Sequence, residues 1–179
     1  DGLYGLEFTA PKNRIINTIV YEYLTSRDQS GPILQNPSGD MSGQAGGMDW
    51  YYIHTYYQSW QHWGMSICNP HTLSPLYNEE PTLTMPNQRL RSHHIGFDGQ
   101  PTNTLHYRFM GSWSKHWGSL EDPLPTPLTQ LSLMGELTYS PLKWRGWQFT
   151  GALALDRSLL IGNNFGGMIT IRKIGKIKD

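Results

Sequence analysis

Apolar and polar residues alternate along several short segments of the chain. In residues 104–113 the apolar positions are Leu105, Tyr107, Phe109 and Trp113, and the opposite face holds polar residues such as His106 and Arg108. The same period of two recurs in five further segments: residues 4–8, 14–23, 130–139, 147–156 and 165–172. Successive side chains of a β-strand point to opposite faces, so the pattern predicts strands with one apolar and one polar face. Residues 89–98 give a weaker seventh strand.

The contents of the two faces favour a membrane barrel over a sandwich. The polar face holds Arg, His, Gln, Ser, Thr and Glu, whereas the water-facing side of a sandwich is rich in Lys and Glu. Aromatic residues near the strand ends, Tyr107, Trp113, Tyr139 and Trp147, match the girdles at the two membrane interfaces. We therefore predict an all-β fold, an antiparallel transmembrane β-barrel. A secreted β-sandwich is the alternative.

The connections alternate in predicted length. Short turns are expected at residues 10–13, 99–103 and 140–145, and long connections at about 26–88, 115–128 and 157–164. Bacterial barrels have short periplasmic turns and long extracellular loops, which places the C-terminus in the periplasm. The chain would then have about seven crossing strands, with its first residue on the outer side of the membrane. Because single-chain bacterial barrels have an even number of strands, residues 1–179 are expected to be one domain, the C-terminal portion of a barrel with further strands before Asp1.

Composition and charge exclude several other classes. Charged residues make up 16% of the chain, below the roughly 25% of soluble domains, and aromatic residues make up 12%. The formal net charge is zero, which argues against a nucleic-acid partner. No apolar run approaches the ~18 residues of a spanning helix. The single cysteine, Cys68, excludes an internal disulfide.

The long connection contains an aromatic stretch, residues 49–64, that reads DWYYIHTYYQSWQHWG. Sugar rings stack on flat aromatic side chains, and neighbouring polar groups replace the water on their hydroxyls. This combination predicts a polysaccharide-binding surface, although the same rings could instead pack the loop onto itself as a plug. The candidate residues within it are Trp50, Tyr52, Tyr56, Tyr57, Trp60, His62 and Trp63.

Charged and histidine residues flank the same connection. Arg27 precedes it, and Arg89, Arg91, His93 and His94 follow it, so we include all five as candidate polysaccharide ligands, since Arg binds carboxylates bidentately. Lining a lumen or linking loops is the other interpretation of these charges. Adjacent residues of a strand face opposite ways, so His93 and His94 are not expected to share a metal ion.

No catalytic pattern or cofactor motif is apparent. The sequence has no GxSxG, HExxH or phosphate-loop motif, and nothing pairs the carboxylates Asp49, Glu79, Glu80 and Asp98 across a cleft. The prediction is therefore a protein that is not an enzyme and that uses no cofactor and no metal.

Four ordered segments resemble the Wzi-like capsule assembly family of the Bacteroidetes type. They are residues 1–7 (DGLYGLE), 20–32 (VYEYLTSRDQSGP), 56–70 (YYQSWQHWGMSICNP) and 87–96 (NQRLRSHHIG), and residues 162–171 resemble that family's terminal strand. Cys68 and Gln88 depart from the usual Gly and Asn. The resemblance implies an outer-membrane lectin that binds capsular or exopolysaccharide and helps attach it to the cell surface, in contact with outer-membrane lipid and other capsule export components.

A porin or transporter for a small solute or oligosaccharide is the alternative function. In that case polar-face residues such as Arg108, Glu136 and Arg172 would line the lumen and select the solute.

Overall fold

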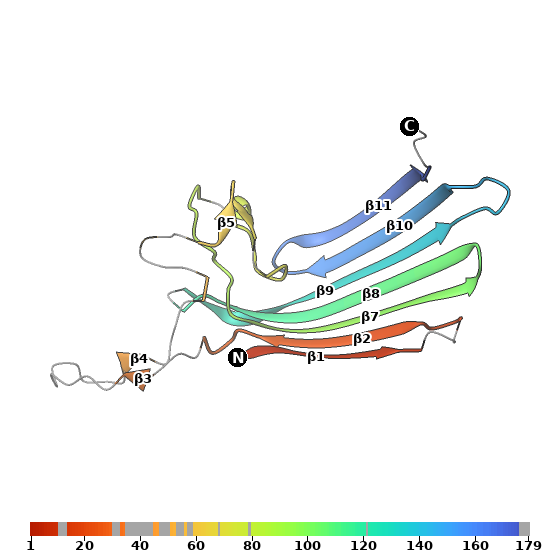
Figure 1. Ribbon diagram of the computed structural model, residues 1–179. Helices are drawn as coiled ribbons and strands as arrows, with labels where there is room; N and C mark the ends of the chain where they lie inside the picture. The colour runs from red at the N-terminus through yellow and green to blue at the C-terminus, as the bar shows by residue number, and fades with distance from the viewer. Residues whose placement is uncertain are drawn as a thin grey trace. The chain divides into compact units, whose positions relative to one another are not determined.

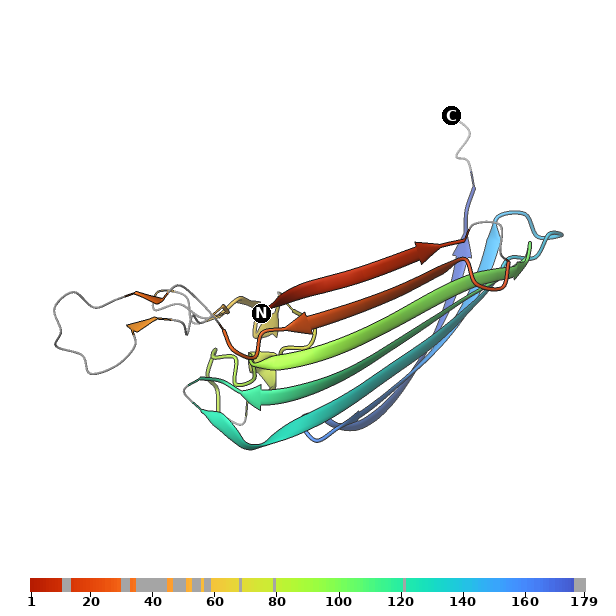
Figure 2. The same cartoon turned by 90° about the horizontal axis from the view of Figure 1, so that it is seen from below.

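The fold is all-β and is dominated by one antiparallel sheet of seven strands (Figure 1). The computed structural model describes residues 1–10, 14–29, 33–34, 45–46, 51–52, 56, 59–67, 69–78, 80–120 and 122–175. The sheet order is β1-β2-β7-β8-β9-β10-β11, and Figure 2 shows these strands side by side. Their bounds are β1 (Gly2–Thr9), β2 (Thr18–Thr25), β7 (Leu90–Thr102), β8 (Leu105–Gly118), β9 (Pro123–Tyr139), β10 (Trp147–Ser158) and β11 (Gly162–Lys173).

Smaller elements lie between β2 and β7. They are the strand pair β3 (Ile33–Leu34) and β4 (Ala45–Gly46), the hairpin β5 (Gln61–His62) and β6 (Met65–Ser66), and the 3₁₀-helix η1 (Pro75–Tyr77). Within the described part of the chain, no helix has the length and apolarity that crossing a membrane requires. The chain forms two compact units. Unit 1 contains residues 1–3, 24–92 and 114–128, and unit 2 contains residues 4–23, 93–113 and 129–179.

All seven predicted strands exist, including the weak one at residues 89–98, which extends as β7 to Thr102. The period of two located the strands well because it reflects a local property of the extended backbone. Their ends were less accurate. β2 begins at Thr18 and not at residue 14, and β9 begins seven residues before the predicted strand.

Two of the three predicted long connections are wrong. β8 ends at Gly118 and β9 begins at Pro123, so four residues replace the long connection expected at 115–128. Three residues join β10 to β11, where 157–164 was expected. Prolines, which lack a backbone N–H, stand at the alternate positions 123, 125 and 127 of β9. However, β9 pairs with β10 only from Gln130 onward, and proline is tolerated where a strand has a free edge.

Unit 2 presents one apolar face that the described residues leave uncovered. Phe165 and Ile169 of β11 are 76% and 86% exposed, and Leu153 of β10 is 61% exposed. Register places them together: Gly151 lies opposite Leu137 and Ile169, and Leu155 lies opposite Phe165. Ala152 is the one buried hydrophobic residue in the described part of unit 2. The apolar positions of these strands therefore do not form the core of a two-layer domain.

The opposite face of unit 2 is polar in register as well. Thr138, Thr150 and Thr170 stand in one row across β9, β10 and β11, and the hydroxyls of Thr138 and Thr150 are 2.8 Å apart. Arg108 pairs with Glu136 across β8 and β9 at 3.2 Å. The predicted division into an apolar and a polar face is thus confirmed for these strands.

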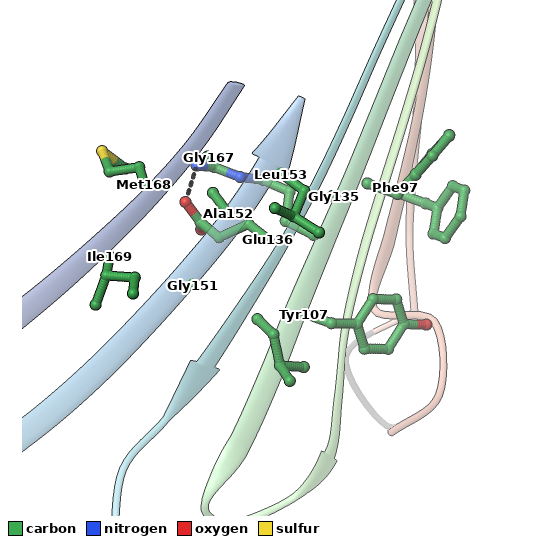
Figure 3. A pocket seen from close by; sticks show the side chains of 13 residues that line it. Phe97, Tyr107, Gly135, Glu136, Gly151, Ala152, Leu153, Gly167, Met168 and Ile169 are labelled. Carbon is green, nitrogen blue, oxygen red and sulfur yellow. Dashed lines mark hydrogen bonds and ion pairs between the residues drawn. The ribbon is translucent and has the colours of Figure 1, made fainter. Parts of the chain in front are cut away.

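Glycines leave a hollow of about 810 Å³ over strands β7 to β11 in unit 2 (Figure 3). Gly135, Gly151 and Gly167 line it beside Leu153 and Ile169. A Cβ added at Gly135 or Gly151 would meet no atom within 4 Å. The hollow is a consequence of small residues at apolar-face positions.

Candidate functional site

A second hollow, of about 740 Å³, lies in unit 1 and is lined by two segments between β2 and β7. The first segment is the hairpin of β5 and β6 with its turn, which contributes Gln61, His62, Trp63 and Gly64. The second segment runs from η1 to Leu83 and contributes Leu76, Asn78 and Glu80 among others. An indole, an imidazole, amides and a carboxylate therefore line one space.

The turn of this hairpin holds Trp63 in an unusual conformation. Trp63 has φ +52° and Gly64 has φ +79°, so both central residues of the two-residue turn are left-handed. Such hairpin turns favour Asn, Asp or Gly, and a bulky residue at positive φ costs about 1–3 kcal/mol. Trp63 is 87% exposed, and its ring meets the His62 ring edge-on with centroids 6.2 Å apart, so little burial offsets this cost. The turn therefore presents the indole to solvent at a cost in backbone conformation.

Hydrogen bonds fix the two segments to each other. The Gly64 N–H donates to Gln61 Oε1 at 2.7 Å, and the Leu76 N–H donates to the Gly64 carbonyl at 2.8 Å. The Ser66 N–H donates to Ser74 Oγ at 3.0 Å, which joins β6 to the residue before η1. The hollow is thus held by the backbone and by short polar side chains.

Asn78 organises the second segment. Its Nδ2 donates to the carbonyls of Thr82 and Thr84 at 3.0 and 2.9 Å and to the Thr82 hydroxyl at 2.9 Å. Its Oδ1 is buried and has no hydrogen-bond partner among the described residues. Glu80 is exposed beside it. Asn78 and Glu80 were not among the predicted residues, because they enter the hollow through tertiary contacts and not through the aromatic stretch.

The predicted aromatic residues separate in the structure. His62 and Trp63 line the hollow, whereas Trp60 and Tyr56 do not, although they are 59% and 87% exposed. The Trp60 N–H donates to the Tyr52 carbonyl at 3.1 Å. Trp50 and Tyr57 lie outside the described residues.

A buried polar network in unit 1 joins the end of the long connection to β8. His116 is fully buried; its Nδ1 lies 2.6 Å from Asn87 Nδ2 and its Nε2 lies 2.7 Å from Ser114 Oγ. His71 Nε2 lies 3.0 Å from the Ser92 hydroxyl oxygen, which belongs to β7. These five residues have no motif spacing, so the network could not be predicted from the sequence.

The predicted arginines meet around an indole that was not predicted. The guanidinium carbons of Arg27 and Arg91 lie 4.8 and 5.8 Å from the Trp117 ring centre, and Lys115 Nζ lies 5.6 Å from it. Arg89 Nε donates to the Arg27 carbonyl at 2.7 Å. Arg27, Arg89, Arg91, Lys115 and Trp117 are called the cationic cluster below.

His93 and His94 point to opposite faces of β7, as the alternation predicts. His93 Nδ1 lies 2.8 Å from the Tyr21 hydroxyl, and its ring centre lies 5.8 Å from that of Trp113. His94 Nδ1 lies 2.7 Å from the Ser112 hydroxyl on the other side. The two rings therefore belong to different surroundings. Among the described residues, no three His, Cys, Asp or Glu side chains group as metal ligands.

Comparisons with protein-family models, with curated proteins and with solved structures find no match to this chain.

Proposed function

We propose that this chain is part of an outer-membrane β-barrel that binds capsular or exopolysaccharide and helps attach it to the cell surface. The observation that carries the membrane part is the apolar face of unit 2. Its residues Leu153, Phe165 and Ile169 are exposed, and no other described element covers them. Monomeric soluble proteins rarely leave so continuous an apolar surface open to water, whereas lipid requires one.

Under this proposal the strand residues of unit 2 cross the membrane. Ring contacts near one end of the strands, Tyr4 with Tyr23 and His93 with Trp113, have the composition of an interfacial girdle. Trp147 and Phe149 stack at 6.3 Å near the other end. The long connection between β2 and β7 then faces the cell exterior, and the turn between β9 and β10 faces the periplasm.

The hollow at Trp63 supports polysaccharide as the ligand. An exposed indole offers a stacking surface for the CH face of a sugar ring, and Gln61, His62 and Glu80 provide polar groups near it. The left-handed conformation of Trp63 costs stability and presents the ring to solvent. A binding role explains why tryptophan and not asparagine occupies this turn. Weak binding at each site would be strengthened by many repeats along the polymer.

Replacing Trp63 by Asn is expected to reduce polysaccharide binding at least tenfold while leaving the protein as stable or more stable. Asn accepts the left-handed turn, so the hairpin is kept and only the indole is removed. Loss of a central aromatic anchor commonly costs a factor of this size. Capsule retained on cells, normalised to the amount of protein in the outer membrane, measures the effect.

Trp144→Asn is the matched control. Trp144 is 60% exposed in the turn between β9 and β10, and it belongs to unit 2, whereas the hollow is lined by residues of unit 1. The control should retain capsule normally. Equal retention by Trp63→Asn and the original protein would contradict the assignment of this hollow to polysaccharide.

The buried network around His116 should make the attachment of the long connection sensitive to acid. His116 belongs to unit 1, outside the residues proposed to cross the membrane. Burial and, to a smaller extent, the charge of His71 together lower the pKa of His116 to about 4. The unfolded side chain has a pKa of about 6.5, so between these values it binds more protons than the folded one. The stability that neutral His116 contributes is therefore present above pH 6.5 and falls as the pH drops towards 4.

Protease cleavage within residues 26–88 should consequently accelerate between pH 6.5 and 4.5 in the original protein. His116→Gln cannot take up a proton in this range and keeps hydrogen-bonding groups for Asn87 and Ser114. Cleavage of this variant, measured with an acid-tolerant protease and corrected for the enzyme's own pH profile, should depend less on pH. The same pH dependence in both proteins would exclude His116 as the titrating group.

Conductance in planar bilayers tests the porin alternative. The Arg108 to Glu136 ion pair on the polar face is the feature that favours it, since charged pairs line solute channels. Steady single-channel current that changes on replacing Arg108 would favour a channel, whereas a polysaccharide-binding protein with a closed lumen should pass little current.

A further inference from the structure

The cationic cluster has an excess of positive charge that its own neighbours do not neutralise. Four cationic side chains gather within unit 1, and Asp28 is the one carboxylate within 4.0 Å of them in the described part of the chain. Its contacts are long, 3.9 Å to Arg27 Nε and 4.0 Å to Arg91. Asp28 is also exposed, so this pairing is weak.

Two of the guanidinium groups have unused donors. Arg27 Nε and Arg91 Nε are buried and have no hydrogen-bond partner among the described residues. The side chains as a whole remain accessible, at 38% and 39% exposure. The flat Trp117 ring supports them from one side. Such preordered, under-neutralised guanidinium groups fit an anion with several acceptor oxygens.

Strand alternation decides which way the cluster faces. On β8, Ser114 and His116 are buried, and Lys115 and Trp117 between them are on the other face. On β7, Leu90 and Ser92 are buried, and Arg89 and Arg91 are on the other face. Residues two apart on a strand share a face, so Trp113 shares the face of Lys115, and His93 shares the face of Arg91. Both Trp113 and His93 are exposed. By this alternation, the cluster residues of β7 and β8 belong to the same alternate set as His93 and Trp113, and not to the set of Ser92 and Ser114.

We infer that the cationic cluster binds the phosphate groups of a phosphorylated glycolipid in the outer leaflet of the membrane. The inference rests on the proposed membrane orientation, in which the apolar side faces lipid and the end of the strands at Trp113 is the outer interface. Cations placed just beyond an aromatic girdle meet the anionic head groups of the leaflet, not a ligand inside the barrel. Arg27, Arg89 and Arg91, which the sequence suggested as polysaccharide ligands, are thereby assigned to lipid.

The test measures lipid retention by the full chain in a neutral detergent, by native mass spectrometry. The probes are diphosphorylated lipid A, its dephosphorylated counterpart, inorganic phosphate and alginate as an acidic polysaccharide. The original protein should retain the diphosphorylated lipid in preference to the other three. The double variant Arg27→Gln and Arg91→Gln should bind the diphosphorylated lipid about 30-fold more weakly. Each cation near a membrane surface contributes about fivefold to the affinity, and the variant loses two of them.

The double variant Lys143→Gln and Arg145→Gln is the charge-matched control. These two exposed cations lie in the turn between β9 and β10 and should be replaceable without effect on lipid binding. Equal retention of the two lipids, or normal retention by the Arg27 and Arg91 variant, would overturn the inference. Saturation by inorganic phosphate alone, or loss of alginate binding in place of lipid binding, would overturn it too.

The outcomes also separate this inference from the proposed function. Absence of the protein from the outer-membrane fraction would overturn both. A protein that reaches the outer membrane and retains capsule through Trp63, yet shows no phosphate-dependent lipid binding, would overturn the lipid inference only.

Discussion

Replacing Ile169 by Arg is expected to destabilise the assembled protein by about 2–4 kcal/mol, the cost of an arginine near the middle of the lipid-facing side of a barrel. Ile169 is 86% exposed and lies opposite Gly151 on the apolar face of unit 2. At such an exposed position in a soluble protein, the same substitution would change the free energy of unfolding by less than about 0.5 kcal/mol. The two environments therefore predict clearly different results.

Thr170→Arg provides the control on the same strand. Thr170 lies opposite Thr150 on the polar face, so its arginine would point away from lipid and should be tolerated. The free energy of unfolding in lipid vesicles and the amount of folded protein in the outer-membrane fraction measure both variants. An Ile169→Arg protein that is as stable as the original and stays soluble without detergent would refute the membrane proposal.

Gly99→Ala should lower the free energy of unfolding by about 3 kcal/mol or more. A Cβ at Gly99 would overlap the Ile15 carbonyl oxygen and lie 2.8 Å from Tyr107 Cε1. The obstacle is backbone, and it is held in place: the Asn17 N–H donates to the Asp98 carbonyl at 2.8 Å, and the Tyr107 hydroxyl donates to the Ile15 carbonyl. Ile15 cannot yield without breaking these bonds.

Gly135→Ala is the matched control for this prediction. Gly135 also lies within a strand, but a Cβ there would meet no atom within 4 Å. The substitution should leave stability unchanged or raise it by about 0.4–1 kcal/mol through the smaller entropy of the unfolded chain. Unfolding by urea in detergent micelles compares the two variants. Equal stabilities for both would show that residues 14–17 are not fixed against β7.

The strands were predictable from the sequence because their pattern is local. In β10 and β11, Leu153, Phe165 and Ile169 fell on the predicted apolar face, since a period of two follows from the backbone alone. Strand ends were less predictable. Residues 123–128 were expected in a long connection, yet they lie in β9. The prolines there are tolerated because β9 pairs with β10 only from Gln130 onward, which leaves no described partner on that side to need the missing N–H groups.

The candidate site was predictable only in part. The aromatic stretch drew attention to His62 and Trp63, which line the hollow. The same stretch equally favoured Trp60 and Tyr56, which do not line the hollow. Composition does not show which aromatic ring of the stretch will contact the segment from η1 to Leu83. Asn78 and Glu80 carried no signal, since their role depends on the backbone contact between Gly64 and Leu76.

By itself, the sequence determined the all-β fold and which residues share a strand face, because alternation depends only on neighbouring peptide units. The tertiary structure alone decided which strand ends meet. It gathered Arg27, Arg91 and Lys115 around Trp117, although they come from separate segments of the chain. Such groupings depend on the order of strands in the sheet, which period and composition do not encode. The side of the sheet on which these cations lie then followed from the alternation within each strand.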